Sequence, residues 1–557
     1  MGNATRSDNL GLYSWESQDK LSESIPQISA NFQALDEILS RAWIDIKSYG
    51  YGAKGNYNLS TGTGTDDAPA FQKALDRAQN RSSSVTIFVP DGTYRLGNEL
   101  RVYSNTTIIL SPNATLVRDH SKYLLFNGVR AADGGSPISG YNGDGNILIQ
   151  GGTLTGQGNK QTAKASIVHF GHAQNITFDN VTLKDCSNSH HIEFNACKDV
   201  YVKNCNFLGW YGDVDTYNEA IQLDLATPEL TTVAGGDYTP CKNVYIDNTY
   251  FGKSTTAGSK PIGRGVGSHS GAINRFHENI HVTNCTFDST VEWACRAYAY
   301  KDFYFTNNQI INCGRGVNVR SNISTDDKDT IDANTGAQTG KSQNISRFVI
   351  ANNKFGGTMT NGRAIEVYGE ETGRIYYTEV TGNTINCTGL TVGEVVYLNY
   401  VRYATVTGNN VGGDNTGACI ALNGITTEVT IGNNVCAFGN RGIAVYGAGV
   451  VMQNISITGN TIRGMQLSGI HLDSIDGFSC VGNTVFDCNK KAGGDENHIR
   501  IVVGNKNGTV SGNLCTVACP TSIYVSNTNS RINVSGNVLS GGLTNNSSGG
   551  VSANNII

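Results

Sequence analysis

The sequence has little charge and no long apolar run, and each absence excludes a class of protein. Only 16% of its 557 residues are charged, and the formal net charge is −5. Because no basic stripe is present, we expect no nucleic-acid partner. No apolar segment approaches the roughly 20 residues that span a bilayer, so we expect no membrane insertion. The N-terminus "MGNATRSDNLGLYSW" has no apolar core of a signal peptide.

Metal-binding cysteine pairs are also missing. The chain has 14 cysteines but no C-x-x-C pair, which is the common spacing of a structural zinc site. Many of the cysteines fall at expected strand or corner positions, such as Cys205, Cys285, Cys480 and Cys515. We interpret them as free thiols that fill the core as small apolar groups, which implies folding in a reducing cytoplasm. We expect no metal and no cofactor.

What the sequence has in abundance is glycine, with 67 residues, and a repeated phrase rich in asparagine. Nine-residue segments such as "DVYVKNCNF" and "NISITGNTI" alternate apolar and polar residues and then reach Asn or Gly-Asn. The spacing is about 24 residues, and some copies carry longer insertions. The fourteen segments begin at residues 146, 175, 199, 243, 279, 302, 347, 377, 403, 427, 454, 477, 507 and 531.

Each copy has the period of a β-strand, and the Asn or Gly-Asn that follows tolerates the left-handed backbone of a tight corner. A second strand precedes most copies, as in "HIEFN" and "AIQLD". Strand, corner, strand and corner in about 24 residues predict an all-β, right-handed parallel β-helix. The alternatives are a β-sandwich and a propeller, but a propeller blade needs a period of about 40–45 residues.

The N-terminal part predicts a short helical segment ahead of the rod. Apolar residues follow a heptad seam, which favours a trimeric coiled coil over an amphipathic helix that lies on the end of the rod. The seam consists of Ile25, Ile28, Phe32, Leu35, Leu39 and Ala42. We therefore predict an oligomerisation or attachment segment at 1–43, a cap and first coils at 44–145, and the rod at 146–557, with a substrate-binding face around 190–320.

Two consecutive insertions enclose the residues that are hardest to explain as structure. They are "GWYGDVDTYNEAIQLDLA" (209–226) and "GRGVGSHSGAINRFHENI" (263–280). Because side chains alternate along a strand, the apolar residues of "HIEFN" and "AIQLD" point inward and their polar neighbours outward. Three successive coils then bring polar groups within about 5–10 Å of one another. These groups are Glu219, Asp224, His269 and Arg296, with Glu193 one coil earlier.

Such a cluster can perform general acid/base chemistry, with carboxylates for proton transfer, a histidine, and an arginine that stabilises negative charge. The alternative is a polar ladder that only solvates an exposed sheet. The predicted catalytic residues are Glu219, Asp224, His269, Arg296 and Glu193. The predicted substrate-binding residues are Trp210, Tyr211, Tyr217, Gln222, Arg264, Tyr298, Asn318 and Arg320. The aromatic residues Trp210, Tyr211 and Tyr217 suit stacking on a sugar or polyol, or packing of the loop onto the rod. We interpret residues 325–341 as a mobile surface loop.

At this point the sequence resembles a known family. "YGAKG…GTDDAPAFQKAL…VTIFVPDGTYRL" resembles the opening of the pectin-lyase-like β-helix superfamily as found in phage tailspikes, where a short helix caps the rod. The resemblance covers about residues 44–557 and implies a pectin-lyase-like solenoid. "KLSESIPQISANFQALDEIL" is similar to the segment with which many tail fibres and appendages begin.

A closer resemblance concerns the central block. "EAIQLDLA", "PCKNVYIDNTYF", "GRGVGSHSG" and "RAYAYKDF" resemble pre-neck appendage proteins of small phages of Gram-positive bacteria. That family binds and cleaves wall teichoic acid, which implicates Glu219, Asp224, His269 and Arg296. The coil order also resembles that of polygalacturonases, but their adjacent pair of aspartates is missing, which argues against pectin as substrate.

Together these features predict a homotrimeric phage tailspike or appendage that depolymerises a bacterial cell-surface polymer, most specifically wall teichoic acid, by general acid/base hydrolysis. It would be assembled in the host cytoplasm, reside in the virion, and contact other virion tail proteins through its N-terminus. One alternative is a capsular polysaccharide glycosidase or lyase. Another is a receptor-binding spike without catalytic activity.

Overall fold

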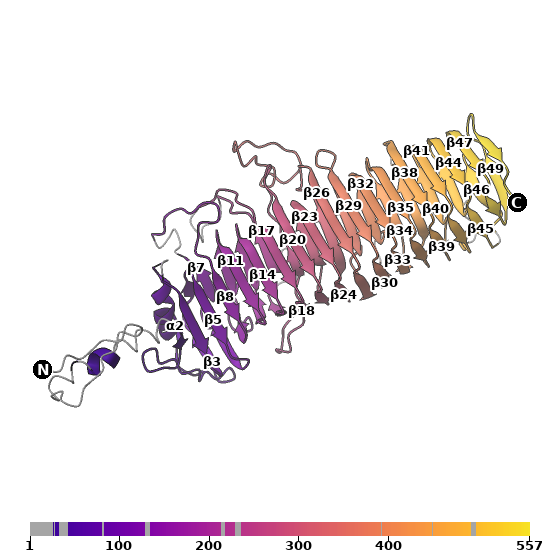
Figure 1. Ribbon diagram of the computed structural model, residues 1–557. Coiled ribbons are helices and arrows are strands. Elements are labelled where there is room, and N and C mark those ends of the chain that lie inside the picture. The colour runs from indigo at the N-terminus through magenta and orange to yellow at the C-terminus, as the bar shows by residue number, and fades with distance from the viewer. Residues whose placement is uncertain are drawn as a thin grey trace, which may run out of the picture.

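Three long parallel sheets wind into a rod that runs from one end of the chain to the other (Figure 1). The computed structural model describes residues 26, 28–32, 43–80, 83–128, 134–212, 218–228, 235–390, 393–447, 449–491, 497–517 and 519–557. The sheets have 18, 16 and 16 strands within this described part. The predicted parallel β-helix is therefore confirmed.

Each coil gives one strand to each sheet. In one coil, β14 (Lys198–Lys203) lies in the first sheet, β15 (Asn206–Tyr211) in the third and β16 (Glu219–Asp224) in the second. The next coil repeats this order with β17 (Lys242–Asp247), β18 (Tyr250–Gly252) and β19 (Arg264–Gly267). The expectation of two strands per coil was wrong. The residues after the asparagine corner, such as Asn206 and Phe207, begin a separate strand rather than completing the corner.

The second sheet contains the candidate site. Its strands, in order of pairing, are β4 (Leu100–Val102), β7 (Leu125–Asn127), β10 (Val168–Gly171), β13 (Ile192–Asn195), β16, β19, β22 (Trp293–Tyr298), β25 (Arg315–Arg320), β28 (Ile365–Tyr368), β31 (Val396–Asn399), β34 (Ala418–Asn423), β37 (Arg441–Tyr446), β40 (Ile470–Asp473), β43 (Ile499–Val502), β46 (Thr521–Val525) and β49 (Gly542–Asn545). The first sheet runs from β1 (Ile44–Asp45) to β50 (Val551–Ala553), and the third from β3 (Gly92–Leu96) to β48 (Val538–Leu539).

Apolar side chains from all three sheets fill the interior. Ile192, Phe194, Ile221 and Leu223 are all fully buried, as the alternation predicts. Equivalent residues of successive coils stack on one another, which buries apolar surface continuously along the rod. All fourteen cysteines are buried and free, so the interpretation as core thiols is confirmed.

A helix covers the first coils at the N-terminal end of the rod (Figure 1). It is α2 (Ala68–Leu75), continued by the 3-10 turn η1 (Asp76–Ala78), and its residues Phe71, Ala74 and Leu75 are fully buried. Most of the predicted heptad seam lies outside the described residues, although 28–32 are helical. No helix in the described part of the chain combines the length and the apolarity needed to cross a membrane.

Each corner between the first and third sheets contains two adjacent residues with different roles. The first adopts a positive φ, as at Asn433 (55°) and Gly459 (66°), which agrees with the predicted corner chemistry. The second is an asparagine whose side-chain amide forms hydrogen bonds with the neighbouring coil. The sequence analysis did not predict this arrangement. This asparagine ladder consists of Asn308, Asn353, Asn383, Asn409, Asn434, Asn460, Asn483, Asn513 and Asn537, and it ends at the half-buried Asn555.

One rung shows why the ladder stabilises the rod. The Asn434 Nδ2 atom donates to the carbonyl oxygen of Val406 at 2.8 Å and to Asn460 Oδ1 at 3.0 Å. Its Oδ1 atom accepts from the backbone nitrogen of Asn409 at 2.9 Å. Val406 and Asn409 are buried, so loss of this amide would remove hydrogen bonds from groups that water does not reach.

We expect Asn434→Ala to destabilise the rod strongly. Each buried group left without a partner costs about 1–3 kcal/mol, and the variant should show faster unfolding in denaturant. The matched control is Asn433→Gly at the neighbouring exposed position, where other coils carry glycine, such as Gly459. Equal unfolding rates for the two variants would contradict a structural role of the ladder.

Candidate active site

The predicted polar residues lie on adjacent strands of the second sheet. Glu193 of β13 pairs in register with Gln222 of β16, Gln222 pairs with Gly267 of β19, and Gly267 pairs with Arg296 of β22. Asn318 of β25 continues the same column. Glu193, Gln222 and Arg296 therefore lie in one column, and the groups share one face of the rod.

Glu219 reaches this face because the alternation of β16 is interrupted. Ala220 and Ile221 both belong to the hydrophobic core, so Glu219, at the start of the strand, returns to the outer side. Gly267 on the neighbouring strand leaves the necessary room, since a Cβ atom there would lie 3.3 Å from Glu219 Cγ. The carboxylate consequently lies flat against the sheet and is fully buried.

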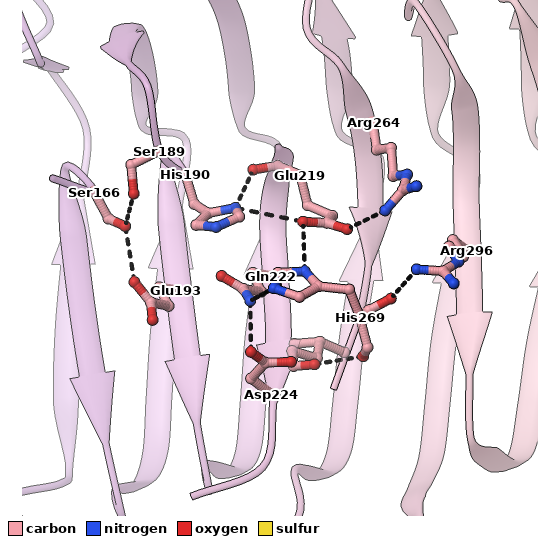
Figure 2. Close-up of polar contacts among 12 residues, drawn as sticks. Ser166, Ser189, His190, Glu193, Glu219, Gln222, Asp224, Arg264, His269 and Arg296 are labelled. Carbon is pink, nitrogen blue, oxygen red and sulfur yellow. Dashed lines mark hydrogen bonds and ion pairs between the residues drawn. The ribbon is translucent and has the colours of Figure 1, made fainter. Parts of the chain in front are cut away.

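Glu219 is the centre of a buried ionic network (Figure 2). Its Oε1 atom accepts from Arg264 Nη1 at 2.9 Å, and its Oε2 atom lies 3.4 Å from His269 Nδ1 and 3.6 Å from His190 Nδ1. Arg264 also pairs with Glu292 at 2.6 Å. Burial alone would raise the pKa of Glu219, but His269, Arg264 and His190 outweigh it and lower the pKa to about 2. Glu219 therefore stays ionised at neutral pH and orients its neighbours.

His269 lies between the two carboxylates Glu219 and Asp224 (Figure 2). Burial disfavours its charged form, but the nearby charges of Asp224 and Glu219 dominate and raise its pKa to about 9. The ring is therefore an imidazolium cation at neutral pH. Gln222 lies against it, with its Nε2 atom 3.3 Å from His269 Nε2.

Asp224 is the carboxyl group that opens to a cavity. Its oxygens accept hydrogen bonds from Gln222 Nε2 and Ser270 Oγ, both at 2.6 Å. Burial raises the pKa of Asp224, and the negative charges of Glu193 and Glu219 act in the same direction, while His269 and Ser270 oppose them. A carboxylate with a raised pKa is a stronger base, and its protonated form is available nearer to neutral pH.

The cavity has a volume of about 590 Å³, which is within the range of small-molecule sites. Asp224 and His269 contribute to its wall beside lysines from two different coils. The residues that line it are Lys164, His190, Asn218, Asp224, Thr227, Pro228, Tyr238, His269, Ser270, Gly271, Asp326, Lys328, Asp329 and Ile331.

The other carboxyl groups that line this cavity, Asp326 and Asp329, come from a segment that the sequence analysis did not assign to the site. Residues 325–341, interpreted as a mobile surface loop, pack on the rod through bridges such as Ile273 with Asp332. Asp329 in this loop is 4% exposed, and burial raises its pKa to about 6. The long step of 45 residues between the repeats at 302 and 347 was the available signal.

Two other predicted catalytic residues lie beside the cavity rather than in its wall. Glu193 accepts from Ser166 Oγ at 2.9 Å and lies 3.2 Å from His169 Nδ1. Burial raises its pKa, but His169 and its other partners dominate and lower it. Arg296 donates to the carbonyl oxygen of Ser268 at 3.2 Å and is 8% exposed.

The three aromatic residues that were predicted to contact substrate differ in their surroundings. Trp210 is 2% exposed and its Nε1 atom donates to the carbonyl oxygen of Ser189, so it packs the insertion onto the rod. The Tyr211 hydroxyl donates to the carbonyl oxygen of Ala257 at 2.7 Å. Tyr217 lies outside the described residues. The second interpretation of these aromatics, loop packing, fits Trp210.

The remaining predicted binding residues are engaged by protein groups. Tyr298 is fully buried with its hydroxyl on Asp329, and its ring faces Arg296 at 4.5 Å. Asn318 Nδ2 donates to Glu366 at 2.8 Å, and Arg320 lies 3.5 Å from Glu370. The structure thus brings Gln222 into contact with Asp224 and His269, whereas the Arg264 guanidinium is bound by Glu219 and Glu292.

We find no group of three or more His, Cys, Asp or Glu side chains that could hold a metal ion among the residues that the structure describes. The side chains at the cavity offer carboxyl groups, an imidazolium and amides. Such a set can transfer protons to and from a bound substrate.

Comparison with known proteins agrees with the fold seen in the structure. A family model described as rhamnogalacturonase A/epimerase, pectate lyase-like, matches residues 43–266. This stretch contains the helical cap and the strands that carry Glu193, Glu219 and Asp224. The fold is that of a pectate-lyase-like β-helix. The resemblance to the pectin-lyase-like superfamily is thus confirmed at the level of fold.

The chain is also similar to individual known proteins and solved structures. Plasmin and fibronectin-binding protein A of Streptococcus pneumoniae is 26% identical over 393 residues, which cover 63% of this chain and 51% of that protein. The chain therefore spans about half the length of this curated relative. The crystal structure of PfbA, a surface adhesin of Streptococcus pneumoniae, is similar with a TM-score of 0.56 and 20% identity, covering 83% of this chain and 93% of that one. Tailspike protein 3 of bacteriophage CBA120 has a TM-score of 0.43 and 14% identity, covering 90% and 62%.

Proposed function

We propose that this β-helix protein binds and hydrolyses a bacterial cell-surface polymer at the cavity beside Asp224 and His269, and that the polymer is wall teichoic acid. The protein would act as a homotrimeric phage tailspike or appendage in the virion, assembled in the host cytoplasm and joined to other tail proteins through residues 1–43. The central resemblance to appendage proteins supports the choice of polymer.

The observation that carries the proposal is the pairing of a carboxyl group and a cation in one cavity. Asp224 has a raised pKa, and His269 has a pKa of about 9 and is held by the buried Glu219. Lys164 and Lys328 add positive charge to the wall. The wall also contains Asp326 and Asp329, so the three cations are the groups that would contact a polyol phosphate chain, which carries one negative charge per repeat.

The same groups suggest how hydrolysis would proceed. Asp224 in its ionised form takes a proton from a water molecule, whose oxygen forms the new bond to phosphorus. The His269 imidazolium neutralises the charge that develops on the phosphoryl oxygens. The bond to the polyol oxygen breaks, and this oxygen must receive a proton to leave as an alcohol.

The direct test is digestion of purified wall teichoic acid, followed by identification of the products. Hydrolysis of a phosphodiester releases glycerol phosphate and leaves a phosphomonoester. A capsular glycosidase would instead create new reducing ends, and a lyase would leave an unsaturated uronate. A panel of wall polymers that all remain intact would overturn the proposed catalysis.

Polymer binding should depend on pH through His269. Its folded-state pKa is raised to about 9 from 6.5, so the cation is present at neutral pH and is lost as the pH rises through 9. We expect the affinity for an anionic polymer to fall several-fold between pH 7.5 and 9.5, as measured by a binding titration. His269→Gln should bind more weakly at pH 7.5 and lose most of this pH dependence. A wild-type affinity that stays constant over this range would contradict the role of His269.

Binding without cleavage is the second candidate function. It is favoured by the relatives whose printed names describe an adhesin and a plasmin- and fibronectin-binding protein. This reading expects retention of full-length polymer with no shortening of the chain, and no effect of Asp224→Asn on that retention. The digestion experiment separates the two candidates.

A further inference from the structure

The proposed hydrolysis lacks a group that protonates the leaving oxygen. Glu219 does not line the cavity, because its carboxylate is buried in ion pairs beneath the surface. Asp326 lines the cavity from an exposed position. Asp329 is the buried carboxyl group that remains beside Asp224.

Asp329 and Asp224 are fixed by two consecutive residues. Ser270 Oγ donates to Asp224 Oδ1 at 2.6 Å, and the backbone nitrogen of Gly271 donates to Asp329 Oδ1 at 2.8 Å. The two carboxyl groups therefore meet the same short segment and both line the same cavity. They come from different coils, Asp224 from the end of β16 and Asp329 from the insertion that follows β25.

Tyr298 fixes the position of the Asp329 carboxyl group by a hydrogen bond. Its hydroxyl donates to Asp329 Oδ2 and accepts from the backbone nitrogen of Ile323 at 2.8 Å. Asn322, next to Ile323, donates to the backbone oxygen of Asp329 at 3.0 Å. A surface loop without function would not need its carboxylate buried and bound from two sides, since burial of a carboxyl group is unfavourable unless other interactions compensate it.

We infer that Asp329 is a catalytic residue, the general acid that works opposite Asp224. This inference rests on the proposed function. In the step, a water oxygen forms a bond to the reacting atom while Asp224 takes the water proton. The bond to the leaving oxygen breaks, and the proton of the Asp329 carboxyl group moves to that oxygen. Both carboxyl groups return to their starting forms when a proton passes back from Asp224 through solvent.

The arrangement agrees with the electrostatics of the loop. Burial raises the pKa of Asp329 to about 6, against the lowering effect of the hydrogen bonds from Tyr298 and Gly271. The protonated acid is therefore well populated at mildly acidic pH, where a carboxyl group with the usual value would be ionised. We expect activity to fall as the pH rises above about 6.

The test compares two aspartates of the same loop. Asp329→Asn should lower the rate of polymer cleavage by about 10²–10⁴-fold, the usual contribution of a positioned proton donor, and should leave polymer binding intact. Asp327→Asn, two residues earlier at an exposed position that does not line the cavity, should stay within about threefold of the wild type. Asp329→Asn with wild-type cleavage would overturn the inference, whereas loss of activity in Asp224→Asn alone would leave the proposed function in place. A wild-type protein that cleaves no polymer would overturn both.

A second variant guards against a folding defect in Asp329→Asn. Tyr298→Phe removes the hydrogen bond that lowers the pKa of Asp329, so that pKa should rise. The alkaline limb of the pH–rate profile should then move to higher pH, a result that a purely structural role of the loop would not produce. An unchanged limb with reduced activity would overturn the assignment of Asp329 as the acid.

Discussion

Asp224→Asn should slow polymer cleavage strongly while the rod stays folded. The amide has the shape of the carboxyl group and can still accept from Ser270, but it cannot take a proton from water. We expect a loss of about 10²–10⁴-fold in rate, the usual contribution of a general base. The measurement is the release of phosphomonoester from purified teichoic acid, with the thermal midpoint as a check on folding.

The matched control for this variant is Asp473→Asn. Asp473 is the last residue of β40 in the same sheet, many coils from the cavity. Its carboxylate accepts a hydrogen bond from the hydroxyl of the neighbouring Ser474. We expect wild-type cleavage from it. If both aspartate variants cleave equally well, the catalytic centre does not lie at Asp224.

Glu219→Gln should have the largest effect on stability. Removal of one partner from a buried ion pair costs about 3–5 kcal/mol, because the other charge is left buried. Arg264 keeps Glu292, so we expect the lower end of this range. Faster unfolding in denaturant is the suitable measurement, since long repeat proteins do not unfold as one two-state unit. The pKa of His269 should fall as well, which a histidine NMR titration can follow.

The ionised Glu219 carboxylate should make the stability of the rod depend on pH in the acidic range. The pKa of Glu219 is lowered from 4.5 to about 2 in the folded state, so its contribution is present above pH 4.5 and is lost as the pH falls towards 2. Glu219→Gln should lack that part of the acid sensitivity. Glu428→Gln is the control, because its pair with Arg402 lies at the surface, where an ion pair adds little to stability. Equal unfolding rates of the two variants would refute the buried network.

The sequence predicted the parts of the structure that follow from strict periodicity. Once the repeats are aligned, alternation places Ile192 and Ile221 inside and Glu193 and Gln222 outside, and the register confirms each pair. Arg296 follows by the same reasoning. These positions depend only on the period of two and on the constant stacking of coils, both of which are visible in the letters.

Departures from periodicity could not be predicted. The position of Glu219 depends on two consecutive inward residues, Ala220 and Ile221, which alternation does not anticipate. Asp329 lies in an insertion whose path is set by tertiary contacts, such as the hydrogen bond from Gly271, rather than by local pattern. Trp210 follows Gly209, whose φ of 69° redirects the chain and buries the indole. In each case the backbone or a distant contact decides the placement.

The ladder of buried amides also bears on how such a rod changes length during evolution. Neighbouring rungs such as Asn434 and Asn460 are 26 residues apart and make equivalent bonds to the coils on either side. Loss or gain of one whole coil of the solenoid would let the flanking amides meet again, so the length of the rod can change in discrete steps. Deletion of a single residue within a strand would instead exchange its inner and outer faces.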